Sequence, residues 1–341
     1  MKVKAVALLS GGLDSTLAVK LVLDQGIDVV ALNFVTPFCN CTGKSSSCKS
    51  EAVRVAREFG IPVRVRYKGM EYLKIVERPR HGRGRGLNPC IDCRIFMHKE
   101  AKELLVEEGA SFLVTGEVLG QRPMSQRRDA IRVIERESGT EGLILRPLSA
   151  KHFEPTVAER EGWVDRERLL AIEGRSRKEQ IRLADELGVT DYPCPAGGCL
   201  LTDASFAARL QDLFNHKPGY DLADVRLLRT GRHFRLRPDL KVVVGRDQTE
   251  NEVLERRTGD GETIVRPADF QGPTALAREA MAGSDLVIVG GILLRYGGVP
   301  EGVVTVARDG TETSLPVSTP ARDADLDAVR ISEDRRTGCS V

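Results

Sequence analysis

Apolar and polar positions along the first half of the chain predict strands that alternate with helices. Apolar runs at 3–9, 29–34 and 63–67 are long enough for buried strands, and apolar positions recur at helical spacing at 17–22 and 50–59 between them. Two strand and helix units followed by a third strand predict a doubly wound parallel sheet of the α/β class. In such a sheet, ligands bind beyond the carboxyl ends of the strands.

The pattern changes in the C-terminal part of the chain, where the predicted elements are shorter. Short strands are expected at 225–228, 233–236 and 241–244, and a helix that ends at Met281 is expected before a further strand at 286–289. These elements predict a small α+β domain, followed by a polar tail without periodicity. The expected divisions are an α/β domain at 1–190, a cysteine-containing connector at 191–220, the small α+β domain at 221–316 and the tail at 317–341.

Composition narrows the class of protein. A chain of 341 residues is long enough for two domains with sizeable cores. The 51 basic and 49 acidic residues give a net charge of only +2, so any surface for nucleic acid has to be local. No segment approaches the ~20 apolar residues of a membrane span, and residues 1–6 lead into a strand, so we expect a cytoplasmic protein without membrane attachment. Because the cytoplasm is reducing, the eight cysteines favour metal or redox chemistry over disulfides.

A glycine turn follows the first predicted strand and opens the first predicted helix. Two glycines let the backbone approach an anion, the amides of the helix N-terminus attract phosphate, and neighbouring hydroxyls add donors. An aspartate in the turn is suited to hold Mg²⁺ or to orient a nucleotide. The turn has neither the Gly-Lys-Ser/Thr of a Walker loop nor the Gly-x-Gly-x-x-Gly of a dinucleotide site. Its candidate nucleotide-binding residues are Ser10, Gly11, Gly12, Asp14, Ser15 and Thr16.

The turn, Ser-Gly-Gly-Leu-Asp-Ser-Thr at the end of a first strand, resembles the PP-loop of ATP pyrophosphatases, which activate a carbonyl or carboxyl oxygen as an adenylate. The resemblance implies an adenine nucleotide alpha hydrolase-like fold, with ATP and Mg²⁺ as cofactors. It also implies that the end of the second strand lies beside the adenine, which makes Asn33 and Phe34 candidate nucleotide neighbours.

The segment after the fourth predicted strand, at 112–114, sharpens this resemblance. Residues 115–126 match a segment of the PP-loop domain of tRNA 4-thiouridine synthetases at Thr115, Gly116, Glu117, Leu119, Gly120, Gln121, Ser125 and Gln126. Residues 145–148 and 177–181 resemble the fifth-strand exit and the following helix of that family, so the similarity covers residues 1 to about 190. The resemblance implies uridine thiolation in tRNA. Its implied site has Asp14 in a catalytic role and Thr115, Gly116 and Gln121 at the nucleotide.

Two cysteine pairs are candidates for the sulfur chemistry. Cys90 and Cys93 form a Cys-x-x-Cys at a predicted helix start, which lowers thiol pKa values and brings two sulfurs within reach of one metal. By itself the pair is compatible with half a zinc site, a dithiol redox pair or two ligands of an iron–sulfur cluster. The resemblance points to family members that lack a rhodanese domain and use such a cluster. Cys194 and Cys199 lie in a turn rich in proline and glycine that suits a third ligand.

We therefore predict a [4Fe-4S] cluster held by Cys90, Cys93 and one of Cys194 and Cys199, with the remaining thiol as a catalytic sulfur carrier. Three protein thiolates leave one iron open to bind hydrosulfide or substrate. A zinc site made of the same four cysteines is the structural alternative. No role is assigned to Cys39, Cys41 and Cys48.

Two basic stretches are candidates for RNA binding. Arginine alternates with glycine at 78–86, a pattern that predicts an unpacked, mobile cationic loop. Seven basic residues and one acidic residue lie from Arg226 to Arg246, where alternation along strands gives one packed and one cationic face. A solvated surface is the alternative for both stretches. The residues chosen as RNA contacts are Arg80, Arg83, Arg85, Arg232 and Arg235.

We predict an ATP-dependent tRNA sulfurtransferase that adenylates a uridine carbonyl oxygen, releases pyrophosphate and replaces AMP by sulfur. The match at 115–126 favours 4-thiouridine over 2-thiouridine. The resembled family usually has an RNA-binding region before the PP-loop, whereas the PP-loop begins here at Ser10, so we expect RNA recognition elsewhere in the chain. The small C-terminal domain resembles RNA-binding modules appended to other proteins of RNA metabolism.

The expected partners are tRNA and a sulfur donor, either sulfide or a persulfide carrier, and the sequence is also compatible with a homodimer. Two other classes of function stay open. The first is a PP-loop ligase that acts on a small molecule, for which activity would be insensitive to salt and independent of RNA. The second is a zinc-containing RNA-binding protein without catalysis, for which no candidate RNA would stimulate ATP turnover.

Overall fold

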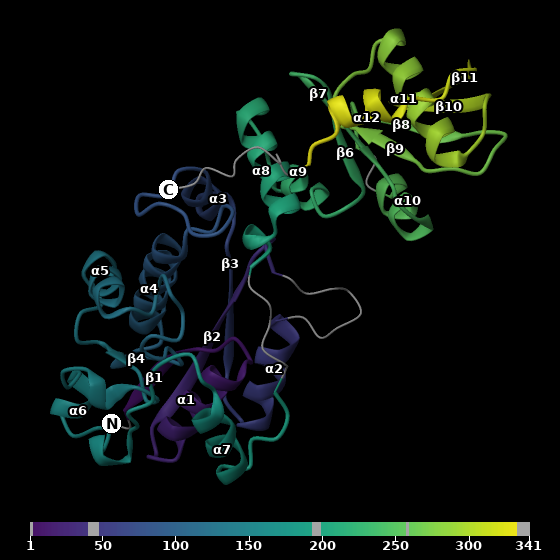
Figure 1. Ribbon diagram of the computed structural model, residues 1–341. Coiled ribbons are helices and arrows are strands. Elements are labelled where there is room, and N and C mark those ends of the chain that lie inside the picture. The colour runs from purple at the N-terminus through teal and green to yellow at the C-terminus, as the bar shows by residue number, and fades with distance from the viewer. Residues whose placement is uncertain (1–2, 40–47, 193–198, 257–258, 333–341) are drawn as a thin grey trace. The chain divides into compact units, whose positions relative to one another are not determined.

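The computed structural model describes residues 3–39, 48–192, 199–256 and 259–332. The chain divides into two compact units, Met1–Thr202 and Asp203–Val341 (Figure 1). Among the described residues, no helix combines the length and the apolar composition needed to cross a lipid bilayer.

A parallel sheet with strand order β3-β2-β1-β4-β5 forms the centre of the first unit, which confirms the predicted α/β fold. Its strands are β1 (Lys4–Leu8), β2 (Asp28–Val35), β3 (Val63–Tyr67), β4 (Phe112–Thr115) and β5 (Ile144–Leu145). The α-helices described in this unit are α1 (Leu13–Leu23), α2 (Cys48–Glu58), α3 (Met70–Glu77), α4 (Cys90–Glu107), α5 (Arg128–Ser138), α6 (Val157–Arg160) and α7 (Lys178–Glu186).

Both faces of the central strand β1 are buried. On β1, Ala5 and Ala7 belong to a core that includes residues of α1 and α2, whereas Val6 and Leu8 belong to a second core that includes Leu104 of α4. Because successive residues of a strand point to opposite faces, helices cover the sheet on both sides. This double burial explains why β1 reads in the sequence as a continuous apolar run.

The carboxyl ends of the parallel strands meet at one edge of the sheet. The glycine loop at 9–12 follows β1, Lys68 follows β3, the segment 116–126 follows β4, and Arg146 follows β5. Helix α4 immediately precedes β4 in the chain, and its first turn contacts Lys68. The start of α4 therefore lies at the same edge as the glycine loop, which is where ligands of such sheets bind.

An antiparallel sheet with strand order β11-β10-β8-β9-β7-β6 forms the second unit, which confirms the predicted C-terminal α+β domain. Its strands are β6 (Arg232–Arg237), β7 (Leu240–Val244), β8 (Thr263–Pro267), β9 (Ala275–Ala277), β10 (Gly302–Arg308) and β11 (Thr311–Val317). The helices described in this unit are α8 (Ala204–His216), α9 (Leu222–Leu227), α10 (Gln248–Glu255), α11 (Gly283–Gly297) and α12 (Asp323–Val329).

Two segments of the second unit have a different secondary structure from the predicted one. Residues 225–227 lie in α9 rather than in a strand, since the Asp221 carboxylate accepts a hydrogen bond from the Asp224 amide and starts a helix. The predicted helix that ends at Met281 contains strand β9 instead. Pairing of β9 with both β7 and β8 places this short segment inside the sheet.

The predicted strand at 286–289 is part of α11. A continuous apolar run fits a buried helix as well as a buried strand. The run continues through Gly290, where a Cβ atom would lie 2.5 Å from Val317 Cγ2, so glycine lets the helix approach β11 closely. The prediction of a tail without regular structure is also wrong for 323–329, because α12 buries Leu326 in the core of this unit.

Candidate functional site

The glycine loop after β1 has the geometry of an anion-binding site. Gly11 has a φ angle of 79°, and Gly12 is the N-cap of α1, where it offers no side-chain acceptor to the first amides. Ser15 Oγ and Thr16 Oγ1 donate to Gly12 O over 2.9 and 3.1 Å. The Ser10 and Ser15 Oγ atoms are 3.0 Å apart. These bonds close the loop and leave the amides of the first helical turn for a phosphate.

The segment after β4 lies directly on this loop. A Cβ atom on Gly116 would lie 2.5 Å from both Asp14 C and Ser15 N, so only glycine fits there. Gln121 Nε2 donates to Asp14 Oδ2 over 2.8 Å. Asp14 Oδ1 is buried and has no hydrogen-bond partner among the described residues. A carboxylate oxygen of this kind fits the expected Mg²⁺.

The two candidate adenine neighbours at the end of β2 differ in their contacts. Asn33 is buried, and its Nδ2 donates to Leu9 O over 2.9 Å, which ties β2 to the start of the glycine loop. Phe34 is half-buried, and Lys68 Nζ lies 5.5 Å from its ring centroid. Asn33 therefore positions the loop through its amide group. Contact of either residue with adenine stays a prediction.

Three arginines that sequence reasoning did not select, Arg94, Arg122 and Arg177, lie at the edge of the sheet that carries the loop. Arg177 Nη2 is 3.7 Å from Asp14 Oδ2. The pKa of Arg122 is lowered, first by loss of solvent around its guanidinium and then by the charges of Arg94 and Arg177. The charges of Asp14 and Cys90 raise the same pKa, but by less. Arg122 is therefore near both the glycine loop and the start of α4. Two of the three fall within the matched segments at 115–126 and 177–181, which was the available sequence signal.

Cys93, in the first turn of α4, lies among polar groups that stabilise a thiolate. Lys68 Nζ donates to Cys93 Sγ over 3.0 Å, and the Tyr72 hydroxyl is also hydrogen-bonded to this sulfur. Burial by itself raises the pKa of Cys93, but the Lys68 ammonium and the bond to Tyr72 outweigh it, so the pKa is lowered from the ordinary value of 9.0. Cys93 is therefore the strongest candidate for a thiolate.

Replacing Lys68 with methionine should raise the pKa of Cys93, because burial then acts without its main electrostatic compensation. At a fixed pH below the pKa of the wild-type thiol, the thiolate fraction falls about tenfold for each unit by which the pKa rises. Alkylation of Cys93 by iodoacetamide in the reduced, metal-free protein should therefore slow, as measured by peptide mass spectrometry. Lys74→Met, which removes an exposed lysine of α3, is the matched control. Equal rates in the two variants would contradict this account of Cys93.

Cys90 and Cys199 have raised pKa values, mainly because both thiols are buried. Burial raises the pKa of Cys199 to about 12, and burial followed by the Cys93 charge raises the pKa of Cys90. Cys199 Sγ donates to Phe38 O over 3.5 Å. The charge of Cys93 acts on the thiols of Cys90 and Cys199, and the charge of Cys39 also acts on Cys199, so these sulfurs lie in one region. Cys194 lies outside the described residues.

These thiols have the donor chemistry of a thiophilic metal centre, and the Cys-x-x-Cys offers two sulfurs from one helical turn. Within the described ranges, however, no group of three or more His, Cys, Asp or Glu side chains is close enough to hold a metal ion. The predicted third ligand is Cys194 or Cys199, and the first of these is not described. Both the [4Fe-4S] cluster and its zinc alternative stay predictions.

A buried ion network connects the elements of this edge. Glu117, 2% exposed, lies with its carboxylate 3.0 Å from Arg146 Nε and 3.5 Å from Arg94 Nε. Thr115 Oγ1 donates to the same carboxylate over 3.3 Å. Burial raises the pKa of Glu117, but Arg146 and Arg94 outweigh it and hold the pKa at about 2. The network joins α4, β4 and the end of β5, and Thr115 takes part in it.

The arginine–glycine segment at 78–86 is held by specific contacts. The amides of Arg80 and His81 donate to the two oxygens of the Asp92 carboxylate over 3.2 and 3.0 Å. The His81 ring is hydrogen-bonded to Asp92 and Glu137, each at 3.0 Å. The prediction of an unpacked loop is therefore wrong, because carboxylates on α4 and α5 supply partners that the composition of the segment does not reveal.

The three arginines chosen from this segment differ in their contacts. Arg80 is paired with Glu137 at 3.2 Å, although 80% of its side chain is exposed. Arg83 Nη2 donates to Glu77 O over 2.6 Å, and Arg85 is exposed. Their contact with RNA stays a prediction.

The stability contributed by His81 should depend on pH. Burial lowers the pKa of His81, but its hydrogen bonds to Asp92 and Glu137 outweigh this and raise the pKa above 6.5. A raised pKa stabilises the folded protein below the unfolded pKa of about 6.5. That contribution, of about 1 kcal/mol or less, is lost as pH rises through the folded value. Urea unfolding at several pH values should show this loss in the wild type and in His216→Gln but not in His81→Gln.

In the second unit, ion pairs neutralise part of the predicted cationic strand face. Arg235 Nη2 and Nε lie 2.6 and 3.2 Å from the two carboxylate oxygens of Asp212 on α8, outside the stretch in which charges were counted. Arg232 instead donates to Gly245 O over 2.9 Å, and its guanidinium carbon lies 4.3 Å from the Tyr296 ring centroid. Arg235 is thus engaged within the unit, and RNA contact by either arginine stays a prediction.

Each unit matches a different known protein family. Residues 1–157 match "Thiamine biosynthesis protein (ThiI)", and residues 231–328 match "NFACT protein RNA binding domain". Both matches agree with the predicted order of a PP-loop domain followed by an RNA-binding-like domain.

Individual relatives are similar to the first unit. A "tRNA-specific 2-thiouridylase MnmA" of Leptospira biflexa is 30% identical over 127 residues, which are 32% of this chain and 33% of that protein. A "Probable tRNA sulfurtransferase" of Methanothermobacter thermautotrophicus is 34% identical over 120 residues, which are 35% of this chain and 30% of that protein. The chain thus spans about a third of the length of these curated relatives. A solved 4-thiouridine synthetase–RNA complex with bound ATP is 24% identical, with coverage of 55% of this chain and 51% of that one and a TM-score of 0.35.

Proposed function

We propose that the protein is an ATP-dependent tRNA sulfurtransferase that forms 4-thiouridine. Its chain joins a ThiI-type PP-loop domain to an NFACT-type RNA-binding domain. The observation that carries the proposal is that the glycine loop, to which Gln121 is bonded through Asp14, and the start of the cysteine helix α4, to which Lys68 is bonded through Cys93, lie at the same edge of the parallel sheet. The charges of both regions, those of Asp14 and Cys90, act on Arg122, which follows Gln121 in the chain. The RNA-binding domain supports tRNA as the substrate.

In the first step, the 4-carbonyl oxygen of uridine attacks the α-phosphorus of ATP. A carbon–oxygen–phosphorus link forms as the bond to pyrophosphate breaks and the N3 proton of uridine leaves. The amides that open α1, together with Arg122 and Arg177, stabilise the charge of the departing pyrophosphate. Asp14, whose Oδ1 has no hydrogen-bond partner among the described residues, would hold Mg²⁺, which would neutralise part of the charge of the pyrophosphate. This step is needed because a carbonyl oxygen is a poor leaving group, whereas AMP is a good one.

In the second step, hydrosulfide attacks the activated carbon. A carbon–sulfur bond forms, the carbon–oxygen bond to AMP breaks, and the proton of hydrosulfide replaces the one lost from N3, so no oxidant or reductant is consumed. Cys90 and Cys93, with Lys68 and Tyr72 around Cys93, form the sulfur-handling side of the site. A [4Fe-4S] cluster on Cys90, Cys93 and either Cys194 or Cys199 would present sulfur for transfer when bound.

A 2-thiouridine product is the second candidate, because the first unit is also similar to tRNA-specific 2-thiouridylases of Leptospira. The two products differ only in which carbonyl oxygen is activated. The chemistry of the glycine loop and of the cysteines is the same for both.

The test begins with anaerobic purification and analysis of iron, sulfide and zinc. About four irons and four sulfides per chain are expected for a cubane cluster, whereas stoichiometric zinc without iron would assign the cysteines a structural role. The protein is then incubated with unmodified tRNA, ATP and sulfide, and the nucleosides are separated after digestion. We expect 4-thiouridine with the wild type and with Cys339→Ser, and its loss with Cys93→Ser. Exclusive 2-thiouridine would support the second candidate, and the absence of both thionucleosides and of AMP would overturn the proposal.

A further inference from the structure

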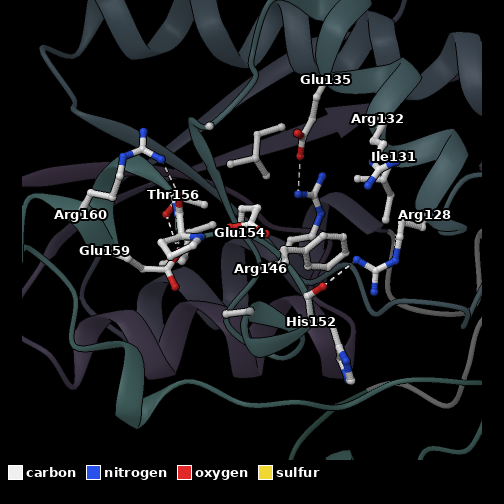
Figure 2. Close-up of a pocket in the computed structure, with 16 residues that line it drawn as sticks. Arg128, Ile131, Arg132, Glu135, Arg146, His152, Glu154, Thr156, Glu159 and Arg160 are labelled. Atoms are coloured by element: carbon white, nitrogen blue, oxygen red, sulfur yellow. Dashed lines mark hydrogen bonds and ion pairs between the residues drawn. The ribbon is translucent and has the colours of Figure 1, made fainter.

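A cavity of about 270 Å³ lies in the first unit beside β5, and its lining includes neither the glycine loop nor the cysteines (Figure 2). Residues of α5, of β5 and of the segment 150–160 form its walls. The volume is below the range of about 300–1,000 Å³ that is typical of sites for whole drug-sized ligands. It is also well above the ~30 Å³ that one water molecule occupies in the liquid. The cavity therefore suits one small chemical group of a ligand.

The walls of the cavity carry an excess of positive charge. Arg146 lies between Arg160 on one side and Arg128 and Arg132 on the other in Figure 2. Arg128 and Arg160 donate to the carbonyl oxygens of His152 and Pro155, over 2.7 and 2.6 Å, which leaves their charges uncompensated. In the described part of the chain, no carboxylate forms an ion pair with Arg128, Arg132 or Arg160.

The carboxylates of the walls are largely occupied by other groups. Glu135 pairs with Arg146. Glu159 accepts hydrogen bonds from Thr156 and pairs with Arg166, a residue that does not line the cavity. Glu154 is the further acidic side chain of the lining, so the three arginines without a carboxylate partner outnumber it.

One aromatic ring holds two of these guanidinium groups near each other. The guanidinium carbons of Arg128 and Arg146 lie 5.5 and 5.2 Å from the centroid of Phe153. Cation–π contacts of this kind fix the position of a guanidinium group. Two like charges held beside one ring repel each other, and an anion between them would relieve that repulsion.

Arg146 also has an unused donor. Its side chain is 4% exposed, and Nε and Nη1 are bonded to Glu117 and Glu135, but the buried Nη2 has no hydrogen-bond partner among the described residues. Buried guanidinium donors are normally satisfied, and phosphate oxygens suit them because they accept paired, charge-assisted bonds. An incoming phosphate oxygen is the acceptor that this group lacks.

We propose that this cavity is a phosphate-binding site, in which Arg128, Arg132 and the unused donor of Arg146 bind one phosphate group. The phosphate belongs either to the backbone of an RNA or to free phosphate or pyrophosphate. The site is distinct from the glycine loop, although Arg146 connects the two regions through Glu117 and Thr115. The proposal does not depend on sulfur transfer, because it concerns binding in the absence of turnover.

The test uses the full-length protein saturated with a non-hydrolysable ATP analogue, so that the glycine loop is occupied. Arg128→Ala and Arg132→Ala are compared with Arg136→Ala, which removes an exposed arginine of the same helix that does not line the cavity. One arm measures the Kd and its salt dependence for an unmodified tRNA transcript. The other arm measures calorimetric binding of inorganic phosphate and of pyrophosphate. Thermal melting of each variant confirms that it is folded.

If the phosphate belongs to RNA, both cavity variants should bind tRNA about tenfold more weakly at low salt. The slope of log K against log salt should also fall by about 1, as expected for one lost phosphate contact. If the ligand is the free anion, tRNA binding stays unchanged while binding of phosphate or pyrophosphate is lost. Equal behaviour of Arg128→Ala, Arg132→Ala and Arg136→Ala in both arms would overturn the proposal.

Discussion

Replacing Gly116 with valine should reduce ATP-dependent release of pyrophosphate by about a hundredfold or more. The first carbon of any side chain at this position would lie 2.5 Å from Asp14 C and Ser15 N, and both are backbone atoms that cannot swing away. The glycine loop or the end of β4 therefore has to shift. A shift of about 1 Å in groups that position a substrate can cost about 10²-fold in rate. The measurement is pyrophosphate release with ATP, tRNA and sulfide.

The same substitution at Gly219 serves as the control, because a Cβ atom there has no neighbour within 4 Å. Circular dichroism and urea unfolding separate a displaced loop from a protein that fails to fold. If Gly116→Val releases pyrophosphate at the rate of Gly219→Val while it remains folded, the glycine loop and the segment 116–126 do not act as one site. A loss confined to Gly116→Val in a folded protein agrees with the close approach of β4 to the loop.

The parallel sheet could be predicted from the sequence because its signals are local and agree with one another. Buried strands such as β1 give apolar runs, and the first two are each followed by a segment with helical spacing. The second unit was harder, because its signals conflict. The apolar run of α11 suits either a strand or a helix, and β9 is only three residues long and depends on its neighbours β7 and β8.

The candidate site shows a similar division between local and distant signals. The glycine loop is contiguous in the sequence, and the structure places its hydroxyls around Gly12 as a turn of this kind requires. Lys68 could not be selected, because its proximity to Cys93 arises from the order of strands in the sheet. The available sequence signal for Arg122 was its place in the matched segment 115–126. Carboxylate partners such as Asp212 are equally distant in the sequence from the arginines that they neutralise.

Replacing Glu117 with glutamine should lower the free energy of unfolding by about 3–5 kcal/mol, the range typical of breaking a buried ion pair. Glu117 and Arg146 are 2% and 4% exposed and 3.0 Å apart, and Arg94 lies 3.5 Å from the same carboxylate. Glutamine keeps the shape of the side chain but leaves both guanidinium charges without this partner. The measurement is urea unfolding at neutral pH, with an unchanged m-value as the sign that the two folded states are alike.

Glu107→Gln is the matched control, because it breaks an exposed pair with Arg66 and should cost no more than about 1 kcal/mol.

The two substitutions should also differ in their stability at acidic pH. The pKa of Glu117 is held at about 2 in the folded protein, whereas an unfolded glutamate has a pKa of about 4.3. The stability that Glu117 contributes is therefore present above the unfolded pKa and is lost as pH falls through the folded one. The wild type and Glu107→Gln should lose this stability between about pH 4.3 and 2, while Glu117→Gln, which has no carboxylate to protonate, should not. If Glu117→Gln is as stable as Glu107→Gln at neutral pH, the network at the edge of the sheet contributes specificity of contact rather than stability.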